Sequence, residues 1–172
     1  MSLWTTAWTI GHNHKVKETA SRVPEPEKQD LGLVWVSCPY EEEEVVVAPL
    51  VKEALAHKSR VYIGKEPPQK EDPCCVLLCT SSGDGIVSEM RRLQSQAPNS
   101  PVVVFSQTKE PRLVEAALRA GAGGFVHAGM QPQTIAMALT LASEGEVVIP
   151  REVLGELLGQ RLFLRRPKLL DP

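Results

Sequence analysis

The sequence is poor in aromatic residues and has no long hydrophobic run. Aromatic side chains make up 5% of the 172 residues, which suits a core built from aliphatic side chains, as in many α/β domains. No apolar run approaches the roughly 20 residues that a transmembrane helix needs. The N-terminus also lacks the basic start and apolar stretch of a signal peptide. We therefore expect a cytoplasmic protein with no membrane partner.

The chain also has little net charge and few cysteines. A formal net charge of -2 gives no nucleic-acid footprint over the whole chain. The cysteines have no Cys-x-x-Cys spacing and fall in or beside predicted buried strands, which favours reduced, buried thiols over disulfides or a metal site. They are Cys38, Cys74, Cys75 and Cys79. We expect neither a metal nor a cofactor.

Short apolar runs alternate with helical patterns through most of the chain. Five runs predict β-strands, over residues 31–38, 60–64, 74–79, 102–106 and 124–127. Five segments predict helices, over residues 45–57, 86–96, 111–120, 132–143 and 151–164. This alternation predicts a flavodoxin-like, doubly wound α/β fold with a five-stranded parallel sheet in the order 2-1-3-4-5.

One connection breaks the alternation. Residues 65–73, KEPPQKEDP, carry three prolines and five charges and predict a loop in place of a helix between the second and third strands. We expect one sheet face to be partly uncovered there, or covered by the tail or by a partner. The domain divisions that follow are a flexible Pro/Glu-rich tail over 1–30, one domain over 31–150, and a C-terminal helix and linker over 151–172.

A family resemblance is carried by the stretch from Pro101 to Gly129. A buried strand ends at Ser106, a helix ends in Ala-Gly-Ala at residues 120–122, and the next strand opens with Gly124-Phe125. The stretch resembles the last third of a response-regulator receiver domain of the NarL/LuxR type, and the resemblance extends over about residues 31–150. It implies the flavodoxin-like fold and a role in two-component signal transduction and transcription regulation.

The resemblance also maps the family's phosphorylation site onto this chain. In that family an Asp at the end of the third strand accepts a phosphoryl group, two acidic residues after the first strand hold Mg²⁺, and a hydroxyl and a Lys contact the phosphoryl oxygens. The aromatic switch position of the family is kept as Phe125. The matching positions here are Cys79 for the acceptor, Ser37 and Cys38 for the acidic pair, Ser106 for the hydroxyl and Ala128 for the Lys.

These substitutions predict a degenerate pseudo-receiver. Without carboxylates the pocket has no evident site for Mg²⁺, a cation that prefers oxygen ligands. We therefore expect a phosphorylation-independent, non-enzymatic regulatory module. Two alternatives remain open: an active receiver with an unusual acceptor, and a small-ligand sensor or thiol enzyme that uses Cys79.

Two other groups could supply a carboxylate to the pocket. Asp84 is a candidate acceptor, although Gly83-Asp84-Gly85 is typical of a turn, which we favour. The run Glu41 to Glu44 could reach the pocket, although we favour a solvated acidic helix start. For Ser106 we favour a hydroxyl that satisfies a strand-end backbone group.

The helix over 132–143 carries no charge from Gln133 to Ser143. We predict an interface on its outer side, formed by Ala136, Met137, Thr140 and Leu141. In receivers this helix belongs to the face between the fourth strand and the fifth helix, so we expect a homodimer or a protein partner there. The alternative is that the tail or the final helix covers this side of the helix. The C-terminal residues resemble the linker to a helix-turn-helix domain, which is absent, so we expect this chain itself to bind no nucleic acid.

Overall fold

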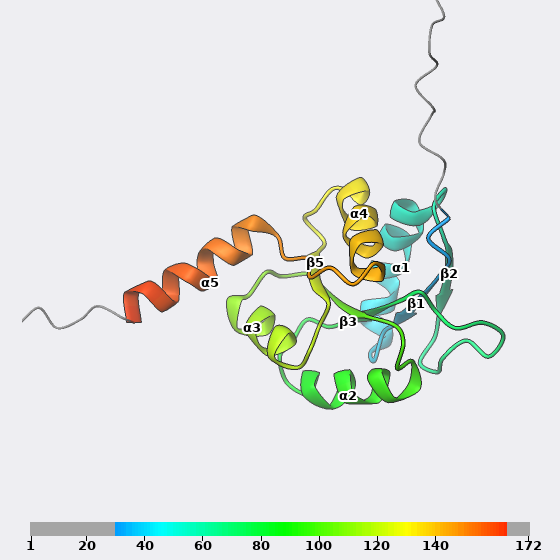
Figure 1. The fold of residues 1–172 in the computed structure, drawn as a ribbon, viewed down its shortest axis with the longest axis horizontal. Helices are drawn as coiled ribbons and strands as arrows, with labels where there is room; N and C mark the ends of the chain where they lie inside the picture. The colour runs from blue at the N-terminus through cyan, green and yellow to red at the C-terminus, as the bar shows by residue number, and fades with distance from the viewer. Residues whose placement is uncertain (1–29, 165–172) are drawn as a thin grey trace, which may run out of the picture.

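Five parallel strands form one sheet in the order β2-β1-β3-β4-β5. The computed structural model describes residues 30–164, with side chains described through residue 159. The strands are β1 (Leu33–Ser37), β2 (Arg60–Ile63), β3 (Cys75–Cys79), β4 (Val102–Ser106) and β5 (Gly124–His127). The predicted flavodoxin-like sheet is confirmed (Figure 1). The predicted tail over 1–30 and the end of the linker lie almost wholly outside the described residues.

Helices cover both faces of this sheet. They are α1 (Glu41–Leu55), α2 (Ile86–Gln96), α3 (Pro111–Arg119), α4 (Pro132–Ser143) and α5 (Arg151–Leu164). Helices α1 and α4 pack on one face, and α2 and α3 on the other. The central strand β3 is buried along its whole length because both faces are covered: Leu77 belongs to the α1 side, and Val76 and Leu78 to the α2 side.

Helix α1 begins four residues before the predicted start at Val45. Its inward side repeats every four residues, with buried Glu43, Val47, Val51 and Leu55. The acidic first turn is therefore part of the helix, and one of its four glutamates, Glu43, is buried while the other three are exposed. This places a carboxylate on the face that packs against the sheet.

The predicted loop between β2 and β3 contains no helix. On the sheet face where a helix is missing, Tyr62 of the edge strand β2 is 37% exposed, so the described residues leave this face partly uncovered, the first of the expected alternatives. The next strand inward carries Trp35, which is fully buried and donates its Nε1 hydrogen to the Gly64 carbonyl at 2.7 Å. Arg92 of α2 also reaches the loop and donates to the Lys65 carbonyl at 2.9 Å. A side chain from α2 thus holds part of the region that a helix would otherwise cover.

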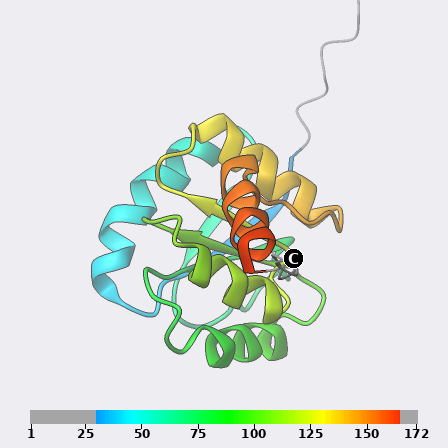
Figure 2. The same cartoon turned by 90° about the vertical axis from the view of Figure 1, so that its left-hand side faces the viewer.

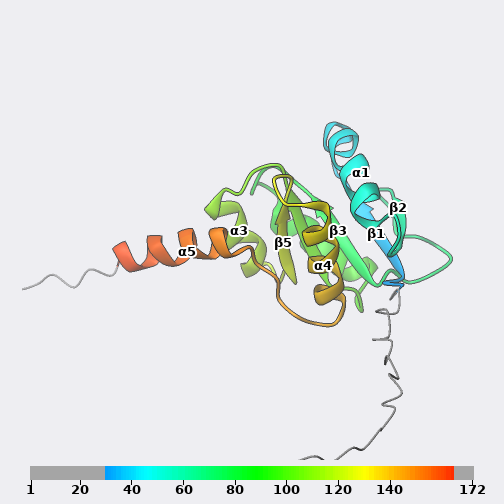
Figure 3. The ribbon, with the colours of Figure 1, turned by 90° about the horizontal axis from the view of Figure 1, so that it is seen from above.

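The segment before α5 runs beside β5 and brings α5 against α3. Gly124 allows this approach, since a Cβ there would lie 2.9 Å from the Val148 carbonyl oxygen. Val153 in the first turn of α5 is fully buried on the α3 side of the sheet. The rest of α5 leads away from the sheet, as Figures 1 and 3 show, and Figure 2 views this helix nearly end-on.

A polar contact also ties α5 to the carboxyl edge of the sheet. His127, at the end of β5, accepts the Gly129 backbone N–H at Nδ1 over 3.1 Å. Its Nε2 therefore carries the hydrogen and donates to Glu152 Oε1 at 2.8 Å. Lys109, in the loop before α3, lies 3.4 Å from the same oxygen.

Within the described residues, no helix has the length and apolar character needed to cross a membrane.

Candidate regulatory site at the carboxyl edge of the sheet

Parallel α/β sheets bind ligands at the carboxyl ends of their strands. The resemblance places its degenerate pocket there, and the structure distributes the six positions over both faces of the sheet. Cys38, Cys79 and Ala128 lie on the α1 side, Ser37 and Phe125 lie on the α2 side, and Ser106 is the last residue of β4. The structure therefore does not gather them around one cavity.

Cys38 and Cys79 are the pair that the structure brings together. Both thiols are free and buried, and they belong to the same core on the α1 side of the sheet. The interaction with the Cys38 thiol raises the pKa of Cys79 well above its ordinary value, and burial raises it further. The nearby carboxylates of Glu43 and Glu44 act in the same direction. Since the thiolate is the reactive form of cysteine, Cys79 is a packed, neutral thiol.

Ser37 accepts a hydrogen bond from an arginine. Arg92 Nη2 donates to Ser37 Oγ at 3.0 Å and also to Glu89 Oε2 at 2.9 Å. Ser37 is fully buried, so its hydroxyl needs hydrogen-bond partners within the protein, and the Arg92 guanidinium is one of them. The end of β1 therefore faces a positive charge on the α2 side, an arrangement that disfavours a divalent cation.

Ser106 supports its own loop. Its Oγ accepts the Thr108 backbone N–H at 3.1 Å and lies 3.5 Å from the Thr108 hydroxyl. This is the strand-end role favoured from the sequence. Phe125 is fully buried in the α2-side core, and Ala128 packs, partly buried, against the α1-side core. Neither side chain offers a charge or a hydrogen bond to a ligand.

Within the run Glu41 to Glu44, the expected solvation holds for three residues and is wrong for Glu43. Its side chain is 7% exposed, and Oε1 accepts hydrogen bonds from the Ser81 backbone N–H at 2.8 Å and the Ser81 hydroxyl at 2.7 Å. Ser81 is the second residue after β3. The four-residue spacing of Glu43 with Val47 and Val51 was the signal that could have found it.

Asp84, the other candidate carboxylate, lies exposed on the turn that the sequence favours. Its backbone N–H donates to Ser82 Oγ at 3.1 Å, and the next residue, Gly85, has a φ of 76°. Across the described part of the chain, no three or more His, Cys, Asp or Glu side chains gather as a metal site would require.

The predicted interface on α4 is partly wrong. Met137 is 60% exposed and Leu141 is 37% exposed, but Ala136 is only 1% exposed. Because α4 packs against α1 as well as against the sheet, its buried arc is wider than that of a helix on a sheet alone. Thr140 is half-buried and donates to the Ala136 carbonyl at 3.0 Å. Of the four predicted residues, Met137, Leu141 and part of Thr140 lie on the surface of α4, which also exposes Gln133 and Thr134.

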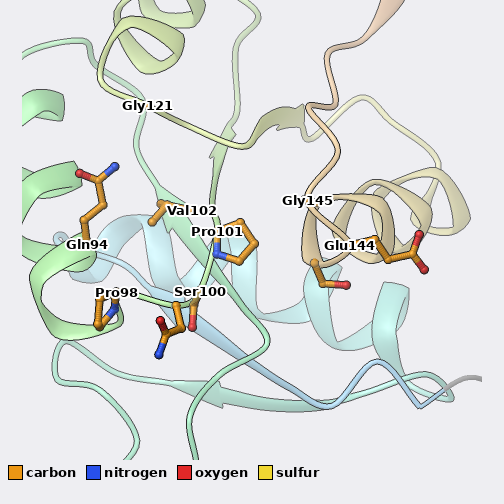
Figure 4. A pocket seen from close by; sticks show the side chains of 11 residues that line it. Gln94, Pro98, Ser100, Pro101, Val102, Gly121, Glu144 and Gly145 are labelled. Atoms are coloured by element: carbon orange, nitrogen blue, oxygen red, sulfur yellow. The ribbon is translucent and has the colours of Figure 1, made fainter.

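A cavity of about 610 Å³ lies at the opposite edge of the sheet, where β4 begins. Figure 4 shows Gln94 and Pro98 on one side of Pro101 and Gly145 on the other. None of the predicted site residues lines this cavity. Its lining has only one ionisable side chain, Glu144, so it offers no set of groups for chemistry.

The sheet order and the helices on its two faces define a flavodoxin-like fold of the receiver kind. Solved receivers share it. A LuxR family DNA-binding response regulator from Silicibacter pomeroyi is 24% identical, with a TM-score of 0.53, over 70% of this chain and 98% of that one. A LuxR family two-component response regulator from Aurantimonas sp. SI85-9A1 is 15% identical, with a TM-score of 0.61, over 76% and 97%. A response regulator from Thermotoga maritima is 18% identical, with a TM-score of 0.55, over 66% and 98%.

The likeness to these proteins is structural. The sequence matches no protein-family model and no curated protein. Identities at this level show a shared fold, and the chemistry of the site has to be argued from the residues of this chain.

Proposed function

We propose that this chain is a phosphorylation-independent regulatory module with a receiver fold, which acts through contact with a second copy of itself or with another protein. The observation that carries the proposal is the thiol at the end of β3. Cys79 is fully buried in the same core as Cys38 and has a raised pKa. A side chain that accepts a phosphoryl group has to be a reactive nucleophile, and a cation beside it has to offset the incoming negative charge. A buried neutral thiol is a poor nucleophile.

The surroundings of Cys79 support the same proposal. Ser37 faces the Arg92 guanidinium, and the Glu43 carboxylate already accepts two hydrogen bonds from Ser81. An active receiver with a displaced acceptor would have to use Glu43 or Asp84. Glu43 is enclosed, and Asp84 is exposed on a turn whose hydrogen bond to Ser82 Oγ comes from the Asp84 backbone N–H. A thiol enzyme at Cys79 would need a thiolate, which the local environment disfavours.

The contact surface that we propose lies on α4. Met137 and Leu141 expose apolar area on a helix whose buried residues pack against the sheet and α1, and Thr140 lies between them in the sequence. An exposed apolar strip of this kind suits a protein partner or a two-fold homodimer. We further propose that the module acts in the cytoplasm, as part of a signalling or transcription regulator, and does not itself touch nucleic acid.

Incubation with acetyl phosphate and Mg²⁺ tests the proposal. Intact-protein mass spectrometry should show no added phosphoryl group, while an active receiver treated in parallel should show one. Stoichiometric phosphorylation of this chain would contradict the proposal. If the wild-type chain became phosphorylated and the Asp84→Asn variant did not, an active receiver with Asp84 as its unusual acceptor would replace the proposed function.

A further inference from the structure

Glu43 is the buried carboxylate in the first turn of α1. The neighbouring Glu41, Glu42 and Glu44 are exposed, while Glu43 is only 7% exposed. Burial of a charged carboxylate is unfavourable unless donors replace the lost water. Ser81 provides two donors, its backbone N–H and its hydroxyl, and both bind Oε1. The location of Glu43 thus depends on a polar site built by the loop after β3.

The groups around that carboxylate have the chemistry of an oxyanion site. A backbone N–H and a hydroxyl converge on one oxygen at 2.8 and 2.7 Å. Hydrogen bonds to an ionised oxygen are stronger than neutral ones. Glu43 is also the third residue of α1, so its negative charge lies at the positive end of a 15-residue helix. Each of these features would serve any small oxyanion equally well.

The site is filled by the chain itself. The space bounded by Glu43, Cys79, Ser81 and Phe105 has no room for a water molecule. The other carboxylate oxygen, Oε2, is buried and has no hydrogen-bond partner among the described residues. A buried oxygen without a donor is unfavourable. Among the described residues, the carboxylate is therefore held through Oε1 only, and its buried position depends on the two Ser81 donors.

We propose that the loop at Ser81 is an oxyanion-binding cradle, and that Glu43 is its built-in occupant. The carboxylate fixes the loop after β3 against α1, and no external phosphoryl group is needed to do so. This deepens the proposed function, because it gives a physical reason why the module is independent of phosphorylation. It also makes a separate prediction: removal of the carboxylate should turn the cradle into a receptor for a small free carboxylate.

The test is chemical rescue of Glu43→Ala. This substitution removes one methylene and the carboxylate, which together match acetate in size. Protection of the Ser81 amide from hydrogen exchange and the urea midpoint of unfolding should both fall in this variant. Sodium acetate, compared with sodium chloride at equal ionic strength, should restore both with saturation. An acetate concentration ten times its Kd raises the folded-to-unfolded ratio about elevenfold. Formate and inorganic phosphate serve as smaller and larger oxyanion probes.

Two controls make the result specific. Glu42→Ala removes an exposed carboxylate from the same helical turn and should leave Ser81 protection unchanged and unaffected by acetate. Wild-type protein should not respond to acetate beyond the chloride control, since its cradle is occupied. Equal behaviour of the Glu43→Ala and Glu42→Ala variants, or an acetate effect no larger than that of chloride, would overturn the inference.

A variant that keeps the shape covers the case in which Glu43→Ala does not fold, with or without acetate. Glu43→Gln retains an oxygen acceptor but loses the charge, so Ser81 protection should fall several-fold. If Glu43→Gln matched wild type, the charge would have no role and the inference would be wrong. These outcomes are independent of the acetyl phosphate test, in which phosphorylation of the wild-type protein would overturn the proposed function.

Discussion

Arg92 is expected to contribute more to stability than its partly exposed position suggests. Its side chain is 31% exposed, yet it joins α2 to the end of β1 and to the loop after β2. Arg92→Ala leaves the buried Ser37 hydroxyl without this donor, at a cost of about 1–2 kcal/mol. Loss of the bond to the Lys65 carbonyl and of the Glu89 ion pair adds roughly 0.5–1 kcal/mol. We expect a total loss of about 2 kcal/mol in the free energy of unfolding.

Arg91 provides the matched control, because it is exposed on the same helix. Arg91→Ala makes the same change in side chain and helix propensity, and it should alter the free energy of unfolding by less than about 0.5 kcal/mol. Urea titration followed by circular dichroism measures both variants. Arg92→Lys keeps the charge without the planar fork and should fall between wild type and Arg92→Ala. Equal losses in the Arg91→Ala and Arg92→Ala variants would refute the reasoning.

Three further predictions concern the surface, the thiols and α5. If α4 is the contact surface, Met137→Glu should abolish association measured by light scattering. Val87→Glu changes a residue on the opposite side of the sheet and should leave association intact. Unchanged association in Met137→Glu would contradict a contact surface on α4. Half-buried Cys74 should react with a thiol reagent in the native protein well before Cys79, and equal rates would argue against an enclosed thiol. The pKa of Glu152 is held below its ordinary 4.5, first by the hydrogen bond from His127 and then by Lys109. The ionised Glu152 therefore stabilises the fold at neutral pH, and this stabilisation is lost as the pH falls through the lowered pKa. Glu152→Gln should lower the urea midpoint at neutral pH and match wild type in acid. A difference between the two urea midpoints that does not change with pH would contradict this prediction.

The sheet could be predicted because its signals are local. Residues 74–79 form a continuous apolar run, typical of a strand covered on both faces, and the structure buries β3 throughout. The three prolines in residues 65–73 marked the missing helix. Helix α4 was found with its observed bounds, Pro132–Ser143, because its uncharged run has clear ends.

Features that depend on packing between distant elements were missed. Ala136 was assigned to the surface because the helix was considered against the sheet alone, whereas α4 also packs on α1. The Arg92 contact with Ser37 joins residues 55 positions apart, and no periodicity predicts such a pair. Glu43 was misplaced because four consecutive glutamates favour a solvated helix start, and only the location of the Ser81 donors makes burial of one of them favourable.

Binding of a divalent cation at the ends of β1 and β3 tests the central claim most directly. Mn²⁺ can stand in for Mg²⁺, because both prefer oxygen ligands and Mn²⁺ broadens the NMR signals of nearby amides. Ser37, Cys38 and Cys79 offer a hydroxyl and two thiols in place of carboxylates. Titration with Mn²⁺ should therefore broaden the amide signals of these three residues no more than those of exposed acidic residues. Selective, saturable broadening at these three residues, reversed by excess Mg²⁺, would contradict the account.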